Sequence, residues 1–301
     1  MYVSYDYYRI FYFVAKHGSF THAAEALFQN QPNLTRAIKA LETELGCTLF
    51  VRSNKGVRLT PDGERLYAHV AAAMEHILAG EEELATSKSL ESGTLSIGAS
   101  EIALRCFLLP ILNQYRRQYP GIRIKISNHS TPRALSRLKN DLVDLAVVTT
   151  PLPPDSDIAT TTLKTFCEVS VGGESFQELA MGLPISLHTL VEYPMVSLGS
   201  KTSTYDYYLH LFQKHGLDFE AEIEAATADQ LLPLIQHNLG IGFVPEEFLT
   251  DFQTDHVYRI PLDIPYPTRE IVLAKKRTKT LSRPAKELER MIWEYKTKTI
   301  T

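Results

Sequence analysis

Cysteine, tryptophan and long apolar stretches are scarce in this sequence of 301 residues. Its three cysteines, Cys47, Cys106 and Cys167, lie far apart and lack the pair spacing of a metal site, so we expect no disulfide framework, metal or other cofactor. No apolar run approaches about eighteen residues, the length needed for a membrane-spanning helix. The N-terminal residues 1–20 lack the basic segment, apolar segment and small-residue cleavage site of an export signal. These absences disfavour secretion and membrane spanning, and they favour the reducing cytoplasm.

A large excess of charge is also absent, because the formal net charge is −4. A chain of this length with 44% hydrophobic residues folds into two or three globular domains. The charge is uneven, however: residues 1–60 carry seven basic and four acidic side chains, a local charge of +3, whereas residues 61–89 carry two and six, a local charge of −4. This excludes a protein that coats nucleic acid by bulk attraction and leaves a basic surface near the N-terminus.

Three helical patterns fill most of residues 1–60. Apolar residues recur at helical spacing in residues 8–15, and the alanine-rich residues 23–27 form the second helix. Asn30 can cap a third helix over residues 31–45, whose leucine and isoleucine side chains form one buried stripe. Two helices joined by a short turn, with the second polar on its outer face, indicate a helix-turn-helix motif.

The outer face of the third helix carries hydrogen-bonding and basic side chains, which read base edges and grip phosphates. Residues 49–52 and 57–60 read as two strands around a turn, so the motif has a basic wing. A solvated helix face is the alternative, which the basic wing disfavours. The residues that we expect at DNA are Gln31, Pro32, Asn33, Thr35, Arg36, Lys39, Arg52 and Lys55.

A dense series of motifs in the first 65 residues also carries a family resemblance. These motifs are Gly18–Thr21, Ala23, Ala24, Leu27, Gln31, Pro32, Thr35, Arg36, Ile38, Lys39, Leu41, Glu42, Leu45, Gly46, Leu49, Phe50, Arg52, Leu59, Thr60 and Gly63. They resemble the DNA-binding head of LysR-type transcriptional regulators, with Thr35 where that family usually has serine. The resemblance implies double-stranded promoter DNA, a small-molecule effector and RNA polymerase as partners.

Residues 61–90 are predicted to form a linker and dimerisation helix, because Thr60 and Pro61 mark a helix start. The helix is too long to bury its apolar seam against the small head, so we predict a homodimer through it. A solvated spacer helix that packs on its own domain is the alternative. The family resemblance alone implies a homotetramer. The seam alternates steps of four and three, as a coiled coil does: Leu66, Val70, Ala73, Ile77, Gly80 and Leu84.

Residues 91–301 alternate strand and helix patterns, as βαβ units do. By the resemblance, they form an effector-binding domain of two α/β lobes, of the type II periplasmic-binding-protein-like fold. Lobe I is predicted to contain residues 91–163 and 268–301, and lobe II residues 164–267. The predicted fold class is therefore α/β, with an α-rich winged helix-turn-helix head, a long linker helix and this two-lobed domain.

Serine and threonine residues follow several predicted strands, where ligands bind beyond the carboxyl ends of an open α/β sheet. Each of them alone is more simply a helix cap, but their convergence favours a binding site. We expect a small polar or anionic metabolite there, with Arg105 as a nearby cation. The predicted effector-binding residues are Ser100, Glu101, Ser130, Thr131, Thr149, Lys201, Thr202, Ser203 and Thr227.

Catalytic constellations are not evident. Residues 240–242 lack the third glycine of a dinucleotide-binding loop, and His69 and His76 are too far apart on a helix to share a metal. A solute-binding protein or a two-lobed enzyme with a helical head is the rival interpretation. A redox pair of Cys106 and Cys167 is a weaker alternative. We predict a bacterial transcription regulator without enzymatic activity, located in the cytoplasm and on the nucleoid when bound to DNA.

Overall fold

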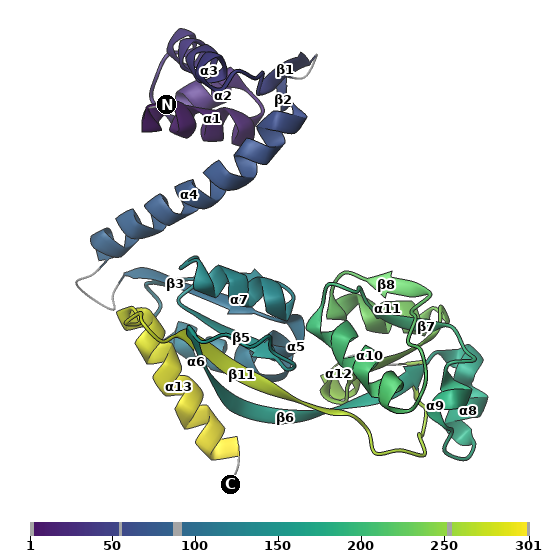
Figure 1. The fold of residues 1–301 in the computed structure, drawn as a ribbon. Coiled ribbons are helices and arrows are strands. Elements are labelled where there is room, and N and C mark those ends of the chain that lie inside the picture. The colour runs from purple at the N-terminus through teal and green to yellow at the C-terminus, as the bar shows by residue number, and fades with distance from the viewer. Residues whose placement is uncertain (1–2, 54–55, 87–91, 252–254, 300–301) are drawn as a thin grey trace. The chain divides into compact units, whose positions relative to one another are not determined.

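The computed structural model describes residues 3–53, 56–86, 92–251 and 255–299 (Figure 1). The contacts divide the chain into two compact units, Met1–Ala85 and Thr86–Thr301. Each unit buries apolar side chains in a core of its own. Within the described ranges, no helix combines the length and apolar character needed to cross a membrane.

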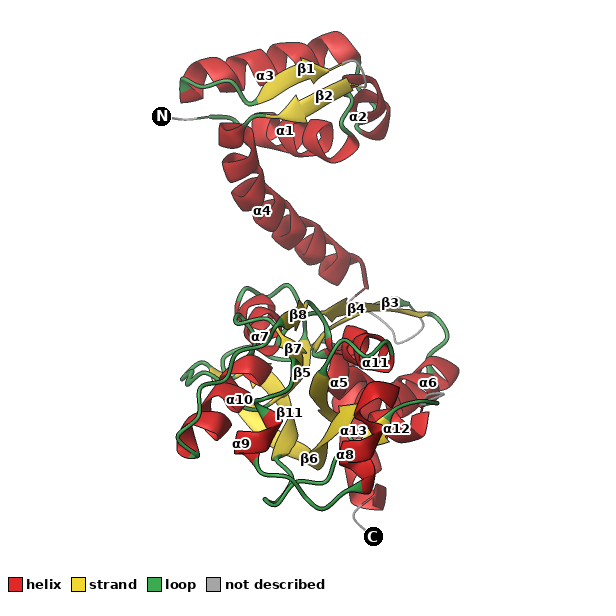
Figure 2. Ribbon diagram, turned by 90° about the vertical axis from the view of Figure 1, so that its right-hand side faces the viewer, coloured by secondary structure: helices red, strands yellow, loops and turns green. Residues whose placement is uncertain are grey.

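The N-terminal unit is a winged helix-turn-helix followed by a long helix, as the sequence predicts. Its two short strands pair in antiparallel fashion, and Figure 2 shows them beside the three short helices. The elements are α1 (Tyr5–His17), α2 (Phe20–Ala26), α3 (Gln31–Leu45), β1 (Phe50–Ser53), β2 (Gly56–Leu59) and α4 (Pro61–Thr86).

Side-chain caps define the turn of the helix-turn-helix. The hydroxyl of Ser19 accepts a hydrogen bond from the amide of His22 at 3.3 Å and so starts α2. The side chain of Asn30 accepts one from the amide of Asn33 at 3.1 Å and starts α3. These bonds satisfy amides that have no partner inside the helix. Gly46 ends α3 at φ +69°, a left-handed conformation that glycine adopts without strain.

Polar and apolar contacts join α3 to the wing. Leu34 and Leu41 on α3 are completely buried in the core of the unit. One residue after Leu41, the carboxylate of Glu42 accepts hydrogen bonds from the amides of Leu49 at 2.7 Å and Phe50 at 3.2 Å. The start of β1 is therefore tied to the same helix that presents the predicted DNA-binding face.

Two close backbone approaches require glycine in this unit. A Cβ on Gly63, at the start of α4, would lie 2.2 Å from the carbonyl oxygen of Leu49. A Cβ on Gly56 would lie 2.4 Å from the carbonyl oxygen of Gly18, and Gly56 has φ +126°. The amide of Val57 donates to the same Gly18 carbonyl at 3.0 Å. The wing therefore packs directly against the loop between α1 and α2, because no side chain separates the two backbones.

The long helix α4 corrects the prediction for the first half of its apolar seam. Val70 and Met74 are buried in the core of the head, and Leu66 packs against that core. These side chains turn inward because α4 continues directly from the wing. Farther along, Ile77 and Leu78 are 38% and 43% exposed. Leu66 and Val70 are thus not available to a partner helix, whereas Ala73 and Ile77 are exposed, and the side chain of Leu84 lies outside the described part of the chain.

The second unit consists of helices packed around a nine-stranded sheet (Figures 1 and 2). One half holds β3 (Gly93–Ala99), α5 (Glu101–Ala103), a π-helical turn (Leu104–Leu108), α6 (Leu109–Gln118), β4 (Ile122–Asn128), α7 (Thr131–Lys139), β5 (Leu145–Thr149) and α13 (Arg283–Thr299). The other half holds α8 (Gln177–Met181), α9 (Leu187–Leu190), β7 (Met195–Leu198), α10 (Ser203–Lys214), β8 (Ile223–Ala225), α11 (Leu231–Gln236), β9 (Ile241–Pro245), α12 (Glu247–Asp251) and β10 (Tyr258–Arg259). Short 3₁₀ turns at Glu174–Phe176 and Ala228–Gln230 precede α8 and α11.

Two long strands, β6 (Ile158–Gly172) and β11 (Thr268–Lys276), connect these halves. The strand order is β4-β3-β5-β11-β6-β9-β7-β8, and β10 pairs with β6. The first part of β6 pairs with β11, and its last part pairs with β9 of the other half. Within each half, β3, β4 and β5 or β7, β8 and β9 are parallel. This is the two-lobed α/β architecture that the sequence predicts.

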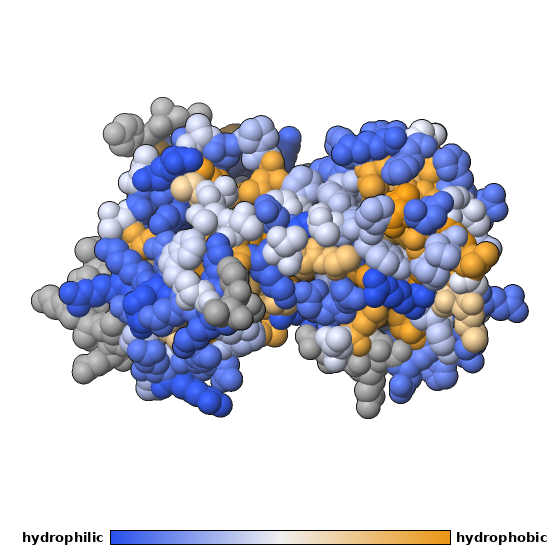
Figure 3. Space-filling view, turned by 90° about the horizontal axis from the view of Figure 1, so that it is seen from below, coloured by the Kyte–Doolittle hydropathy of each residue, from blue (hydrophilic) through white to orange (hydrophobic). Residues whose placement is uncertain are grey.

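The surface of this unit is mainly hydrophilic on the face seen in Figure 3, with separate apolar patches that are larger over the half containing β7 to β9. The most exposed large apolar side chains of that half are Met181 and Leu183. The two halves are distinguishable in the same view as two masses joined by a narrower middle.

A buried ion pair lies where the long strands pass between the halves. The guanidinium of Arg269 on β11 is 3.0 Å from the carboxylate of Glu168 on β6, and both side chains are at most 1% exposed. Arg269 also donates to the hydroxyl of Thr149 at 3.0 Å and to the carbonyl of Thr150 at 2.6 Å. The second carboxylate oxygen of Glu168 accepts a hydrogen bond from the hydroxyl of Tyr208 on α10. One network therefore contacts both halves.

Tyr208 keeps its proton in this network. Burial, together with the nearby carboxylate of Glu168, raises the pKa of Tyr208 well above its ordinary value. The hydroxyl therefore stays neutral and acts as a donor to Glu168 at every pH at which proteins normally fold. The ion pair therefore holds Thr149 through Arg269 and Tyr208 through Glu168.

Removal of Arg269 alone should destabilise the protein strongly. We expect Arg269→Met to lower the free energy of unfolding by about 3–5 kcal/mol, because Glu168 is then buried without a counter-ion. The double variant Arg269→Met/Glu168→Leu should recover part of that loss, because no unpaired charge remains. Urea unfolding followed by circular dichroism measures both, and Arg65→Met, at a side chain 79% exposed, is the control. Equal losses in the single and double variants would contradict a role for the buried charge.

Candidate functional site

The outer face of α3 presents most of the side chains expected at DNA. Gln31, Pro32, Asn33, Arg36 and Lys39 are exposed. Leucine, alanine and isoleucine on the opposite face are buried in the head, so the orientation of this face is fixed by packing. Within the N-terminal unit, this polar face is therefore free to contact another molecule.

Of the three remaining predicted DNA-binding residues, the structure describes the side chain of Thr35 but not those of Arg52 and Lys55. Thr35 is partly buried. Its hydroxyl donates to the carbonyl of Gln31 at 3.1 Å, one turn earlier in the same helix. Arg52 lies on β1, but its side chain is outside the described part of the chain, and Lys55 lies outside the described residues altogether. The backbone of the wing is positioned by the Gly18 and Glu42 contacts.

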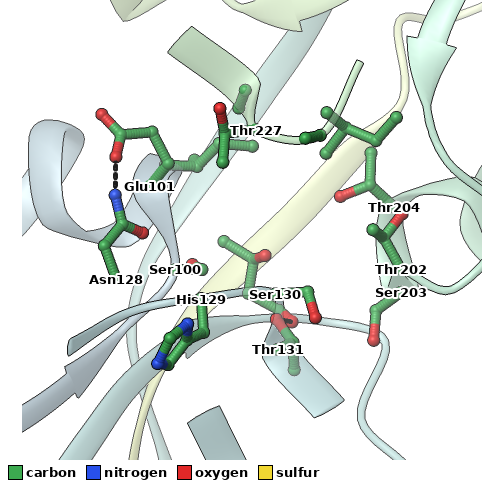
Figure 4. A pocket seen from close by; sticks show the side chains of 15 residues that line it. Ser100, Glu101, Asn128, His129, Ser130, Thr131, Thr202, Ser203, Thr204 and Thr227 are labelled. Atoms are coloured by element: carbon green, nitrogen blue, oxygen red, sulfur yellow. Dashed lines mark hydrogen bonds between the residues drawn. The ribbon is translucent and has the colours of Figure 1, made fainter. Parts of the chain in front are cut away.

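A pocket in the second unit lies between the two halves of the sheet (Figure 4). It is formed by the segments that follow β3, β4 and β5 in one half and β7 and β8 in the other. Its lining residues are Ser100, Glu101, Ile102, Asn128, His129, Ser130, Thr131, Thr149, Leu198, Thr202, Ser203, Thr204, Ala226, Thr227 and Ala228. The carboxyl ends of parallel strands from both halves thus meet at one site, as is usual for ligands of open α/β sheets.

Some of the hydroxyl groups in the pocket have structural partners. Thr131 donates to the carbonyl of Thr149 at 3.0 Å, and the hydroxyl of Thr149 accepts from Arg269. Thr202 caps α10, because its hydroxyl accepts from the amide of Tyr205 at 3.2 Å. These groups shape the pocket and fix its helix ends, as helix caps do.

Other hydroxyl groups have no such partner. Ser203 and Thr204, at the start of α10, are only 5% and 7% exposed. In the described part of the chain, neither hydroxyl forms a hydrogen bond, and the same holds for Ser130 and Thr227. These hydroxyls line the pocket and can therefore form hydrogen bonds with a ligand there.

The charged groups of the pocket differ from the expectation. Lys201 is exposed and does not line the pocket, because it lies in the turn before the Thr202 cap and extends into solvent. Arg105 is 3.7 Å from Glu101, and its guanidinium stacks 4.9 Å above the ring of Phe248. Among the described residues, no lysine or arginine lines the pocket. Glu101 is its one carboxylate within that described set.

His129 is uncharged at neutral pH. Burial lowers its pKa below the ordinary value, and the nearby cations Arg133 and Arg137 lower it further. The imidazole therefore contributes hydrogen-bonding capacity to the pocket and no positive charge at pH 7.

Eight of the nine predicted effector-binding residues line this pocket, and Lys201 does not. The sequence reasoning missed seven further lining residues. Asn128, His129 and Thr204 each adjoin a predicted residue, so a search of strand ends for all polar types would have found them. The apolar residues Ile102, Leu198, Ala226 and Ala228 carry no chemical signal in the sequence.

The cysteines do not form a bonded pair. Cys47, Cys106 and Cys167 are all free and partly buried. Burial, with the nearby carboxylate of Glu246, raises the pKa of Cys167 above its ordinary value. Its thiolate fraction at neutral pH is therefore low, which disfavours the redox-pair alternative. Metal sites are also not indicated, since no group of three or more suitable side chains lies together in the described ranges.

A DNA-binding winged helix-turn-helix and a separate two-lobed ligand-binding unit together define a ligand-responsive DNA-binding protein. The family model described as "Bacterial regulatory helix-turn-helix protein, lysR family" matches residues 5–64. The model described as "LysR substrate binding domain" matches residues 88–296. The chain therefore belongs to the LysR family of transcriptional regulators. Members of this family are regulators and not enzymes, which confirms the prediction for this chain.

Curated relatives and solved structures agree with this assignment. The chain is 26% identical over 281 residues to the uncharacterized HTH-type transcriptional regulator YvbU of Bacillus subtilis (strain 168), covering 92% of this chain and 94% of that protein. It is 27% identical to the transcriptional regulator AlsR of the same organism, covering 82% of each chain. The fold is similar to that of CbnR, a LysR family transcriptional regulator, with a TM-score of 0.71, 16% identity, and coverage of 97% of this chain and 98% of CbnR.

CbnR has also been solved in complex with its target DNA. That structure matches with a TM-score of 0.72, 17% identity, and coverage of 97% of this chain and 99% of the other. Full-length BenM matches with a TM-score of 0.58 and 24% identity, over 99% of this chain and 98% of BenM. At these identities the matches establish the shared fold.

Two adjacent hydroxyls of α10 should respond differently to mutation. We expect Thr202→Ala to lower the free energy of unfolding by about 1 kcal/mol, because the amide of Tyr205 loses its capping acceptor. Ser203→Ala should change it by less than about 0.5 kcal/mol, because its hydroxyl has no partner to lose. Urea unfolding at pH 7 compares the two variants. A larger loss for Ser203→Ala than for Thr202→Ala would show that the partner assignments are wrong.

Proposed function

We propose that this regulator reads double-stranded promoter DNA with the outer face of α3 and alters that binding when a small molecule occupies the pocket. The observation that carries the proposal is the fixed polar face of α3, opposite a fully buried apolar face. We assign DNA binding to residues 1–60, the linker and dimerisation helix to 61–90, and effector binding to 91–301. Within the last, lobe I contains 91–163 and 268–301, and lobe II contains 164–267.

We assign the residues at the start of α3 to base contacts in the major groove. A recognition helix enters the groove with its N-terminal residues at the base edges. Gln31 and Asn33 can pair with adenine, and Arg36 with guanine. Lys39, Arg52 and Lys55 are assigned to phosphates or to the adjacent minor groove, where they add affinity without sequence information. Pro32 and the methyl group of Thr35 offer apolar contact to thymine.

Arg36→Ala should weaken specific DNA binding. We expect a loss of about 1–3 kcal/mol on the promoter region beside the protein's own gene, because a bidentate contact to guanine is lost. Fluorescence anisotropy at two salt concentrations measures binding to this DNA and to a scrambled sequence. Arg65→Ala, on α4, removes the same charge away from the proposed interface and is the matched control. Equal losses on both DNAs would instead assign Arg36 to a phosphate.

Homodimerisation is assigned to the exposed part of α4. Ile77 and Leu78 are apolar and exposed, and they follow the part of the helix that packs on the head. A second copy of α4 would cover them in a symmetric pair, which places two recognition helices on two half-sites of a palindrome. We extend this proposal to a homotetramer, formed as a pair of such dimers, on the family resemblance.

Ile77→Glu should break the α4 pair. We expect the molecular mass in solution to fall by half, because two carboxylates would be buried face to face in the seam. Analytical ultracentrifugation of the full chain at micromolar concentration measures the mass. His76→Glu, at the neighbouring exposed position, is the control and should keep the wild-type mass. An unchanged mass for Ile77→Glu would place the dimer contact elsewhere.

Effector action follows from linkage between two binding events. A ligand that contacts both halves of the second unit changes DNA binding only if it binds two arrangements of the protein with different affinity. The pocket meets the structural requirement, because its lining comes from both halves. We propose that the regulator acts in the bacterial cytoplasm, on the nucleoid when bound to DNA, and that it contacts RNA polymerase there.

A further inference from the structure

We propose that the pocket takes a small zwitterion of the α-amino-acid type, with the ammonium group at Glu101 and the carboxylate at the start of α10. This inference rests on the proposed function, in which the pocket holds the effector. It assigns a chemical class to a ligand that the fold alone leaves open.

The two sides of the pocket have opposite chemical character. In Figure 4, Glu101 and Asn128 lie together at one side. Thr202, Ser203 and Thr204 lie at the other side. A ligand in the pocket thus meets a carboxylate on one side and, on the other, the hydroxyl donors of Ser203 and Thr204, because the Thr202 hydroxyl already donates to the carbonyl of Gly199. Such a pair of environments fits a molecule that carries both charges.

The start of α10 suits a single carboxylate. This helix has 12 residues, and its first amides point out of the helix end without intrahelical partners. The N-terminus of a helix carries about half a positive charge and binds anions. The hydroxyls of Ser203 and Thr204, residues that are only 5% and 7% exposed, line the pocket and add two donors at the same end. Hydroxyls and amides can therefore hold a carboxylate without a basic side chain.

The absence of lysine and arginine from the described lining limits the charge that the pocket can accept. A phosphate or a dicarboxylate carries about two negative charges, which helix ends alone compensate poorly. The carboxylate of Glu101 would repel a second negative charge further. A ligand with one negative and one positive charge adds no net charge to the pocket, in which Glu101 already has Arg105 beside it.

Glu101 is held in place and retains acceptor capacity. One of its oxygens accepts a hydrogen bond from the side-chain amide of Asn128, and the other is 3.7 Å from Arg105. A carboxylate offers about four lone-pair sites, so acceptors remain for the three donors of an ammonium group. The side chain of Glu101 is 15% exposed. An ammonium ion there would form a partly desolvated, charge-assisted hydrogen bond.

The size of the pocket favours a small ligand. The space that the centre of a water molecule can occupy in the pocket is about 40 Å³, which suits a small ligand better than a large one. Ile102, Leu198, Ala226 and Ala228 provide the apolar part of the lining. A short aliphatic or hydroxylated side chain fits this surface, whereas a large aromatic group does not.

The test compares ligands that differ by one charge, using the full-length protein. Isothermal titration calorimetry measures the binding of alanine, serine, threonine and valine. Each amino acid is compared with its α-hydroxy acid and its amide, for example alanine with lactate and alaninamide. Succinate and inorganic phosphate complete the panel. We expect at least one amino acid to bind at least tenfold more tightly than both of its matched analogues.

Glu101→Gln identifies the ammonium end of the site. We expect it to weaken the amino acid at least tenfold and to leave the hydroxy acid unchanged or tighter. Thr204→Val, at the other end, should weaken both. Glu220→Gln, at an exposed position, is the control. Tight binding of a hydroxy acid, succinate or phosphate, no binding by any amino acid, or an unchanged preference in Glu101→Gln would overturn the zwitterion proposal.

The proposed function fails in a separate way. If a ligand binds and Thr204→Val weakens it, the pocket is the effector site whatever the outcome for Glu101. If a bound ligand leaves the anisotropy titration with promoter DNA unchanged, occupancy of the pocket is not linked to DNA binding. Both titrations use the same protein preparation, so the two failures are distinguishable.

Discussion

The buried pair of Arg269 and Glu168 constrains the whole effector-binding unit. Two long strands, β6 and β11, run between the two lobes, and this ion pair lies at that passage. Its charges are tolerable because each guanidinium nitrogen and each carboxylate oxygen has a partner within the group formed by Arg269, Glu168, Thr149, Thr150 and Tyr208. Through Thr149 the pair reaches the pocket, and through Tyr208 it reaches the helix whose start forms the opposite wall. The position of the pocket walls therefore depends on a network that both lobes complete.

This constraint explains how the pocket maintains unpartnered polar groups. Ser203 and Thr204 are buried at the start of α10, and that helix is anchored through the hydroxyl of Tyr208 and not through the hydroxyls of Ser203 and Thr204. Preorganised donors lose little conformational entropy when a ligand arrives, so the free energy already spent on burying them contributes to binding. The opposite wall follows the same logic, since Asn128 fixes the carboxylate of Glu101 before any ligand is present.

In the N-terminal unit, close backbone contacts rather than a buried ion pair fix the positions of the elements. Backbone contacts hold the wing, through Gly56 against Gly18 and Gly63 against Leu49. Glu42 joins the wing to α3, so the recognition face and the wing form one rigid surface. In the proposed function, this rigid surface reads DNA by shape and hydrogen bonds, whereas the pocket of the second unit binds a ligand between its two lobes. The two tasks are thus assigned to units with separate cores.

Much of this could be predicted from the sequence, because the relevant signals are local. Helix caps such as Asn30, the apolar stripe of α3 and the hydroxyls at strand ends depend on neighbours a few residues away, and the family motifs lie in one continuous stretch. The residue patterns thus predicted the winged helix-turn-helix and eight residues that line the pocket, whereas the two-lobed fold followed from the family resemblance. Long-range packing decided the rest. Leu66 and Val70 pack on the head because the first turns of α4 contribute to its apolar core, and Lys201 is exposed in the turn before the Thr202 cap. The partnership of Arg269 with Glu168, 101 positions apart, arises only when two distant strands pair. No local pattern encodes such a contact, because its free energy depends on burial that the tertiary structure alone creates.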